Sequence, residues 1–185
     1  MRTLPKIAAF AAVLAIAAIW AWRQPFMAWP RTWWELSRLP APTALPSPVE
    51  GVAARRIADT FGAPRGRDRT HAGVDIFAPR GTAVRSTTRG LVVSVREGDL
   101  GGKQVWVIGP AHERHYYAHL RDWAEGLRAG RVVEAGERLG SVGDTGNARG
   151  TPPHLHYGIY GRSGAYDPLP LLRAQPAAQA DSARR

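Results

Sequence analysis

Two short segments of this sequence each place potential metal-binding side chains close together. His71 and Asp75 are separated by Ala-Gly-Val, and His154 is separated from His156 by a single leucine. On a β-strand, residues two apart point to the same face, so the imidazoles of His154 and His156 are predicted to lie side by side. Neighbouring imidazoles commonly bind metal ions. The alternatives are a loop histidine beside an unrelated aspartate, and a solvent-facing histidine pair.

A third segment with two histidines reads His115-Tyr-Tyr-Ala-His119. If it is a strand, His115, Tyr117 and His119 share one face, and Tyr116 and Ala118 share the other. Ordinary strand residues at a sheet surface are the alternative explanation for this segment alone. Taken together, the three segments supply a carboxylate and more imidazoles than one metal site requires.

One carboxylate and two imidazoles form a ligand set suited to Zn²⁺, and three protein ligands leave a fourth position open, as in catalytic sites. The two remaining histidines can supply a proton acceptor or donor and a group that stabilises charge in the tetrahedral intermediate of hydrolysis. The chain has no cysteine, so a metal must be bound by histidine and carboxylate. No His-Glu-x-x-His sequence occurs, which argues against the thermolysin-like arrangement with glutamate as base.

The chain is strongly basic, with 25 Lys and Arg against 15 Asp and Glu among 185 residues and a formal charge of +10. Such a charge favours anionic partners, which include nucleic acid, lipid headgroups and acidic wall polymers. No helix-turn-helix, zinc-finger or stacked-aromatic pattern is present, so nucleic-acid binding is not expected. Arg65, Arg67 and Arg69 form a local cluster just before His71.

Residues 1–30 are predicted to be a signal anchor with an interfacial segment. Arg2 and Lys6 precede the uncharged run 7–22, and Arg23 and a Trp-rich stretch follow it. A basic start followed by an apolar run is typical of an export signal, and a cleaved signal peptide is the alternative to an uncleaved transmembrane helix. Positive charge on the short N-terminal side predicts that the following domain lies outside the cytoplasm, in the periplasm if the cell is Gram-negative.

Beyond the anchor, the composition divides the chain into three parts. Residues 31–50 contain several prolines and are predicted to be a stiff, extended linker. Residues 51–172 alternate short apolar runs with glycine turns, which predicts a mainly β domain. Residues 173–185 are predicted to be a disordered tail. The runs expected to be strands are 91–95, 104–108, 115–119, 138–142 and 154–160.

The chain resembles the lysostaphin/LytM-type zinc endopeptidases of peptidoglycan over about residues 62 to 172. The matching segments are RTHAGVDIFAPRGTAV (69–84), TRGLVVSV (88–95), LGGKQVWVI (100–108), HYYAHL (115–120), VEAGERLGSVGDTGNARGTPPHLHYGI (133–159) and YDPLPLL (166–172). Their order is that of the family. The resemblance implies a β-sheet sandwich peptidase domain of the duplicated hybrid motif type, with its site in a groove on one sheet.

The resemblance also implies a role for each residue of the site. It implies that His71, Asp75 and His156 bind Zn²⁺, and that His119 and His154 are the two catalytic histidines. His112 and His115 match no required family position and are predicted to be surface residues.

The implied function is zinc-dependent hydrolysis of peptide bonds in peptidoglycan cross-links or stem peptides. The predicted anchor, which the resemblance does not cover, would tie this domain to the inner membrane. The alternative is a non-catalytic, wall-binding regulator that activates other cell-wall hydrolases, as some relatives without the ligands do. The candidate bonds are the D-Ala-to-diaminopimelate cross-link, a glycine bridge and a bond within a stem peptide.

Overall fold

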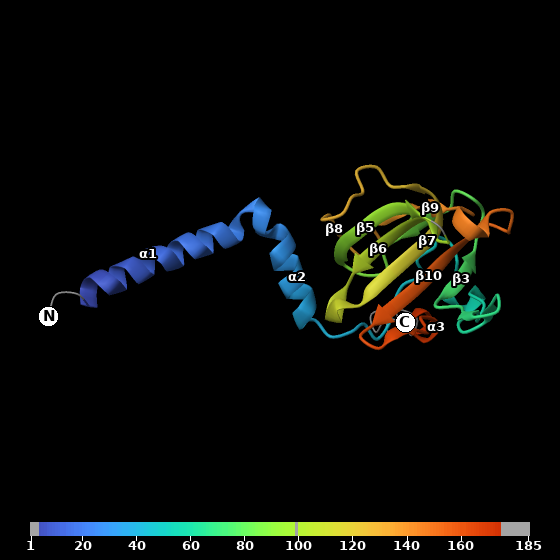
Figure 1. The fold of residues 1–185 in the computed structure, drawn as a ribbon, viewed down its shortest axis with the longest axis horizontal. Coiled ribbons are helices and arrows are strands. Elements are labelled where there is room, and N and C mark those ends of the chain that lie inside the picture. The colour runs from blue at the N-terminus through green and yellow to red at the C-terminus, as the bar shows by residue number, and fades with distance from the viewer. Residues whose placement is uncertain (1–3, 99, 175–185) are drawn as a thin grey trace, which may run out of the picture.

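The protein consists of N-terminal helices followed by a mainly β domain, as seen in a computed structural model that describes residues 4–98 and 100–174. Helix α1 projects away from the β domain, and α2 turns back to meet it (Figure 1). The helices are α1 (Leu4–Arg23), η1 (Pro25–Met27), α2 (Ala28–Arg38), η2 (Ala54–Arg56), η3 (Pro110–His112), η4 (Gly146–Ala148) and α3 (Leu169–Arg173).

Helix α1 contains the whole apolar run that was predicted to span a membrane. In the part of the chain that the structure describes, no one helix combines the length and apolar character needed to cross a membrane. The segments Ile7–Arg23 and Pro25–Arg38 meet those two criteria only as a pair, with a bend of 75° between them. A membrane-spanning anchor therefore stays a prediction.

The predicted linker is not a free spacer. Residues 31–38 belong to helix α2, which ends at Arg38, two residues before Pro40. Leu36 on α2 is fully buried against Leu91 and Ile108. Sequence composition pointed to the prolines but missed this short amphipathic helix, whose apolar face docks on the β domain.

The proline-rich stretch after α2 forms no helix and packs onto the domain. Leu45 and Val49 are 3% and 1% exposed and belong to the main hydrophobic core. Val49 also forms an isolated antiparallel bridge with Val84. The domain that carries the site therefore begins before residue 51.

All five predicted strands are present, and each is somewhat longer than or equal to its predicted range. The strands are β1 (Pro64–Arg65), β2 (Arg69–Thr70), β3 (Val74–Phe77), β4 (Ala83–Arg85), β5 (Gly90–Gly98), β6 (Gly102–Ile108), β7 (Arg114–Trp123), β8 (Val132–Val133), β9 (Arg138–Val142), β10 (His154–Gly161) and β11 (Gly164–Tyr166). Strands β1 and β2 form a separate hairpin.

The other strands form one nine-stranded sheet with the main order β11-β10-β7-β6-β5-β8. Strand β3 pairs with β10, and β9 pairs with both β4 and β7. The mainly β prediction is confirmed. The expected division into the two sheets of a sandwich does not appear in the hydrogen bonding, which joins all nine strands.

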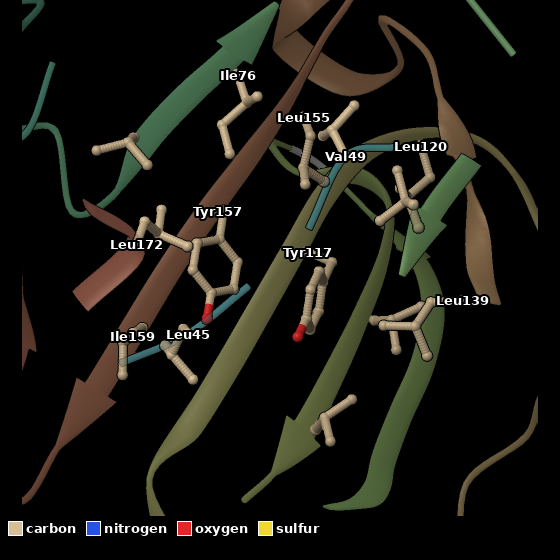
Figure 2. Packing of buried hydrophobic residues seen from close by; sticks show 14 of the residues in the cluster. Leu45, Val49, Ile76, Tyr117, Leu120, Leu139, Leu155, Tyr157, Ile159 and Leu172 are labelled. Atoms are coloured by element: carbon tan, nitrogen blue, oxygen red, sulfur yellow. The ribbon is translucent and has the colours of Figure 1, made fainter. Parts of the chain in front are cut away.

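Buried side chains from strands across the whole sheet, from β8 to β10, pack together in one core. Leu155, Tyr157 and Ile159 on β10 are fully buried there, as the predicted alternation of this strand requires (Figure 2). Tyr117 on β7 lies beside Tyr157, with ring centroids 5.2 Å apart. Because alternate residues of a strand face opposite ways, His154 and His156 are held on the other face of β10.

The C-terminal boundary of the domain lies slightly beyond the predicted one. The guanidinium of Arg173, the last residue of α3, donates a hydrogen bond of 2.9 Å to the carbonyl of Ile57. Residue 173 therefore belongs to the domain, whereas residues 175–185 of the predicted tail lie outside the described residues.

Candidate metal centre and active site

The first two residues of the site are neighbours across two paired strands. Asp75 on β3 and His156 on β10 are direct antiparallel partners. Their side chains therefore share one face, and His156 Nδ1 lies 3.2 Å from Asp75 Oδ1. Gly73 makes this approach possible, because a Cβ there would lie 2.4 Å from the Tyr157 carbonyl oxygen.

His71 completes the group from the loop before β3. Its Nε2 lies 3.0 Å from Asp75 Oδ1 and 2.7 Å from His156 Nδ1. Its Nδ1 lies 2.7 Å from the Thr60 carbonyl, to which it can only donate. That hydrogen bond fixes the tautomer of His71 and leaves an electron pair on Nε2, as the outer partner of a metal-binding histidine does.

The donor atoms of His71, Asp75 and His156 form a group that could hold a metal ion. Electron-pair donors separated by 2.7–3.2 Å repel one another unless a proton or a cation lies between them. A tetrahedral zinc ion with ligand bonds of about 2.0–2.1 Å separates its ligand atoms by roughly 3.3 Å. The residues present thus fit zinc in chemistry and nearly in spacing.

Asp75 is held in its ionised form. Burial alone would raise the pKa of its carboxyl group, but hydrogen bonds and charge interactions with His156 and His71 outweigh burial and place this pKa well below its usual value. The second carboxylate oxygen, Oδ2, accepts a hydrogen bond from the Arg65 guanidinium. Arg65 thereby directs Oδ1 toward the two histidines.

His154 lies beside the metal group on the same face of β10 as His156. Its backbone N–H donates to the Gly143 carbonyl at 3.1 Å, and its ring Nδ1 donates to the Pro152 carbonyl at 2.8 Å. Nε2 is then the free ring nitrogen, and it lies 3.9 Å from Asp75 Oδ1. His154 therefore faces the donor group without belonging to its innermost set of atoms.

His119 reaches the site through an irregularity in β7. Its backbone has a φ of 61°, and the pairing with β6 takes an extra residue between Tyr117 and Leu120. The prediction that His115, Tyr117 and His119 share one face is wrong for His119, because this bulge turns it to the opposite face.

The neighbouring glycine loops fix His119 in this position. Its backbone N–H donates to the Gly101 carbonyl at 2.8 Å, and its Nδ1 donates to the Thr145 carbonyl at 2.9 Å. The two loops touch closely, since a Cβ on Gly102 would lie 2.3 Å from Thr145 Oγ1. Burial lowers the pKa of His119 to about 4, and the charges of His156 and His154 act in the same direction. His119 is therefore neutral at pH 7, with Nε2 available as a proton acceptor.

The two remaining histidines differ in burial. His115 is fully buried, and its Nδ1 lies 2.8 Å from the hydroxyl of Tyr157. His112 is half-buried and stacks on Trp33 of α2, with ring centroids 4.1 Å apart. The prediction of a surface residue is wrong for His115, because strand alternation places it in the core, whereas His112 stays partly exposed beside α2.

All five predicted site residues line one groove of about 290 Å³. The groove also contains side chains beyond the five predicted ones, namely Arg65, Arg69, Leu100, Tyr116, Asn147 and Tyr160. Strict strand alternation predicts that Tyr116 faces away from His119, but the bulge in β7 brings both side chains into the groove. Of the three arginines before His71, the β1–β2 hairpin places Arg65 and Arg69 in the groove.

Residues 69–168, more than half of the chain, match the model of peptidase family M23. The chain belongs to peptidase family M23. The matched region contains all five residues of the site. M23 proteins are metallopeptidases that usually use zinc, which agrees with the His-Asp-His group.

Individual M23 relatives support this membership. The L-Ala–D-Glu endopeptidase of Bacillus subtilis (strain 168) is 39% identical over 142 residues, which make up 71% of this chain and 43% of that protein. The chain thus spans less than half the length of this relative. The solved catalytic domain of lysostaphin from Staphylococcus simulans is 30% identical, with a TM-score of 0.57 over 65% of this chain and 96% of that domain. A zinc-containing peptidase from Vibrio cholerae is 28% identical, with a TM-score of 0.54 over 65% of this chain and 36% of that one.

Proposed function

We propose that this M23 protein is a zinc-dependent endopeptidase that hydrolyses peptide bonds in peptidoglycan. The observation that carries the proposal is the meeting of three metal-donor atoms and two further imidazole Nε2 atoms in one open groove. The donor atoms come from His71, Asp75 and His156. The two other imidazoles belong to His119 and His154.

Zn²⁺ held by the three donors would supply a Lewis acid that polarises the scissile carbonyl and lowers the pKa of a water molecule. The chain's own residues then handle protons and charge. His119 is neutral and can accept a proton at Nε2, since its Nδ1–H is occupied by Thr145. His154 is anchored in the same way and can hold or transfer a proton at its own Nε2. We assign the catalytic role to these two histidines as a pair.

The substrate assignment is supported by the relatives and by charge. The Bacillus relative is named for an L-Ala–D-Glu bond, and lysostaphin is described as an antimicrobial peptidase. A chain with a formal charge of +10 is attracted to an anionic wall polymer. A non-catalytic regulator would be favoured if other residues had replaced some of the ligands. All five positions of the site are filled, so the chain does not have this feature.

The cell envelope is the place where this function is needed. We propose that α1 anchors the protein in the inner membrane and that the M23 domain lies outside the cytoplasm. The apolar side chains of α1 support this, because they are exposed; among them are Phe10, Ile16, Ile19 and Trp20. If α1 lay in a membrane, lipid would cover these exposed apolar side chains.

The test is digestion of purified wall sacculi with residues 24–185, which keep α2 on the domain. We expect soluble peptides that mass spectrometry identifies as cross-link or stem fragments. A chelator should abolish their release, and added Zn²⁺ should restore it. The Asp75→Ala variant is the matched inactive control. Release that continues unchanged in the presence of chelator would refute the zinc mechanism, and no release by the zinc-loaded protein would refute the enzyme.

A further inference from the structure

Two arginines face each other across the hairpin at the rim of the groove. Arg65 in β1 and Arg69 in β2 are direct cross-strand partners. Directly opposed residues lie on the same side of a two-stranded ribbon, and both side chains line the groove. Like charges in such positions repel each other, so the pair is unfavourable unless anions lie beside it.

Only one of these two arginines has an anionic partner in the groove. Arg65 pairs with Oδ2 of Asp75, which is the one acidic side chain among the described residues that line the groove. Asp75 also faces His71 and His156 through Oδ1, so its charge is already shared. Within residues 4–98 and 100–174, no carboxylate forms a salt bridge with Arg69.

The rest of the groove adds no negative charge. Tyr116 and Tyr160 line it, and burial raises the pKa of Tyr116 to about 12, so its phenol is neutral at pH 7. Asn147 and Thr151 are neutral polar residues. A divalent cation held by His71, Asp75 and His156 would make the groove more positive still.

We propose that Arg69, with Arg65 beside it, binds a free carboxylate of the substrate, so that the groove selects acidic stem peptides over uncharged glycine bridges. This inference rests on the proposed function and narrows its substrate. A guanidinium can bind a carboxylate through two parallel hydrogen bonds, which gives both orientation and affinity. Stem peptides carry such carboxylates on D-Glu and diaminopimelate, whereas the interior of a glycine bridge carries none.

Arg67 provides a matched control. It lies in the exposed turn of the same hairpin and does not line the groove. The Arg69→Gln and Arg67→Gln variants therefore lose the same charge from the same hairpin. Only Arg69→Gln removes a guanidinium from the groove.

The experiment compares three probes that all end in a C-terminal amide: the peptide L-Ala-γ-D-Glu-diaminopimelate-D-Ala, the same peptide with its D-Glu and diaminopimelate carboxylates amidated, and pentaglycine. Binding is measured by calorimetry in the zinc-loaded His154→Ala background, and kcat/KM is measured in the active protein. We expect the protein to prefer the free carboxylates by about tenfold or more, as for hydrogen bonds to charged groups. The preference should fall to within about twofold in Arg69→Gln and persist in Arg67→Gln.

Equal effects of the two substitutions, or a protein that binds the amidated peptide or pentaglycine as well as the acidic peptide, would overturn the inference. The proposed function can fail separately. If the active protein cut none of the probes or sacculi but still bound the acidic peptide through Arg69, the carboxylate site would stand and the enzyme would not.

Discussion

The imidazoles of His119 and His154 meet edge to face, with ring centroids 5.0 Å apart, although they come from strands β7 and β10. Each ring donates its Nδ1–H to a backbone carbonyl, that of Thr145 for His119 and that of Pro152 for His154. The two rings are therefore locked in the same tautomer, and both present Nε2 to the groove. His156 differs, because its Nδ1 faces Asp75 and His71.

From this difference we predict that substitutions can separate metal ligands from catalytic groups. Replacing His71, Asp75 or His156 by Ala should remove bound zinc and activity together, since two protein ligands remain and metal affinity falls steeply. The His154→Ala and His119→Ala variants should keep zinc, while the rate on sacculi falls about 10²–10⁴-fold, as for the loss of a positioned proton-transfer group. Atomic absorption on each purified variant gives the metal content.

The His154→Ala and His156→Ala variants form the sharpest comparison, because the two residues share one face of one strand. A metal-free His154→Ala protein beside a zinc-loaded His156→Ala protein would reverse the assignment. If all five variants kept full activity, the site would not be catalytic.

Stability should depend on pH through the buried His115. Burial lowers its pKa from 6.5 to about 4, so between these values the unfolded chain binds a proton that the folded chain does not. The free energy of unfolding should therefore be highest above pH 6.5 and should fall as the pH drops toward 4. The full lowering of this pKa corresponds to a loss of roughly 3 kcal/mol in the free energy of unfolding.

The His115→Asn variant tests this, because an amide can occupy the place of Nδ1 beside the Tyr157 hydroxyl without titrating. Urea unfolding at pH 7 and pH 4.5 should show a smaller loss of stability with acid in the variant than in the parent protein. Other titrating groups, including His119, are the same in both proteins and cancel. Identical losses in the two proteins would show that His115 does not supply the acid sensitivity.

Local pattern was enough to predict the parts of the site that lie on regular strands. The alternation of His154, Leu155 and His156 fixed which side chains face the groove, and the structure agrees. The His71–Asp75 spacing was informative because Gly73 lets this segment lie against β10. In these segments, the periodicity of the strand determines the direction of each side chain.

The parts that failed depend on tertiary contacts. The bulge that turns His119 into the groove is set by contacts with Gly101 and Thr145, which are distant in sequence. The burial of His115 and the docking of α2 likewise depend on elements that meet only in the folded chain. The prolines are consistent with the end of α2 at Arg38, but their count could not show that Leu45 enters the core.

The docking of α2 makes a stability prediction. Leu36 is fully buried against Leu91 and Ile108, so Leu36→Ala should leave a cavity and lower the free energy of unfolding of residues 24–185 by about 2–5 kcal/mol. Trp34 on the same helix is 55% exposed, and Trp34→Ala should change stability by less than about 1 kcal/mol. Urea unfolding followed by circular dichroism measures both. Equal effects would mean that α2 does not contribute to the folded domain.

The bend between α1 and α2 suits a membrane anchor that lies against an interface. Helix α1 and the segment from Pro25 to Arg38 meet at 75°, so if α1 runs along the membrane normal, α2 lies near the membrane plane. Trp29 and Trp34 are 47% and 55% exposed on α2, which suits the interfacial position that tryptophan prefers. We expect the full chain to stay with membranes after carbonate extraction.

A chain that begins at residue 24 should instead be found in the soluble fraction. Leu14→Arg should weaken insertion, because an arginine near the centre of an apolar helix costs about 2.5–3.5 kcal/mol, whereas Leu14→Ile is the matched apolar control. A C-terminal alkaline phosphatase fusion reports the side of the membrane and should be active, because the enzyme matures only outside the cytoplasm. An inactive fusion on a membrane-bound protein would reverse the topology, and a soluble full chain would remove the anchor altogether.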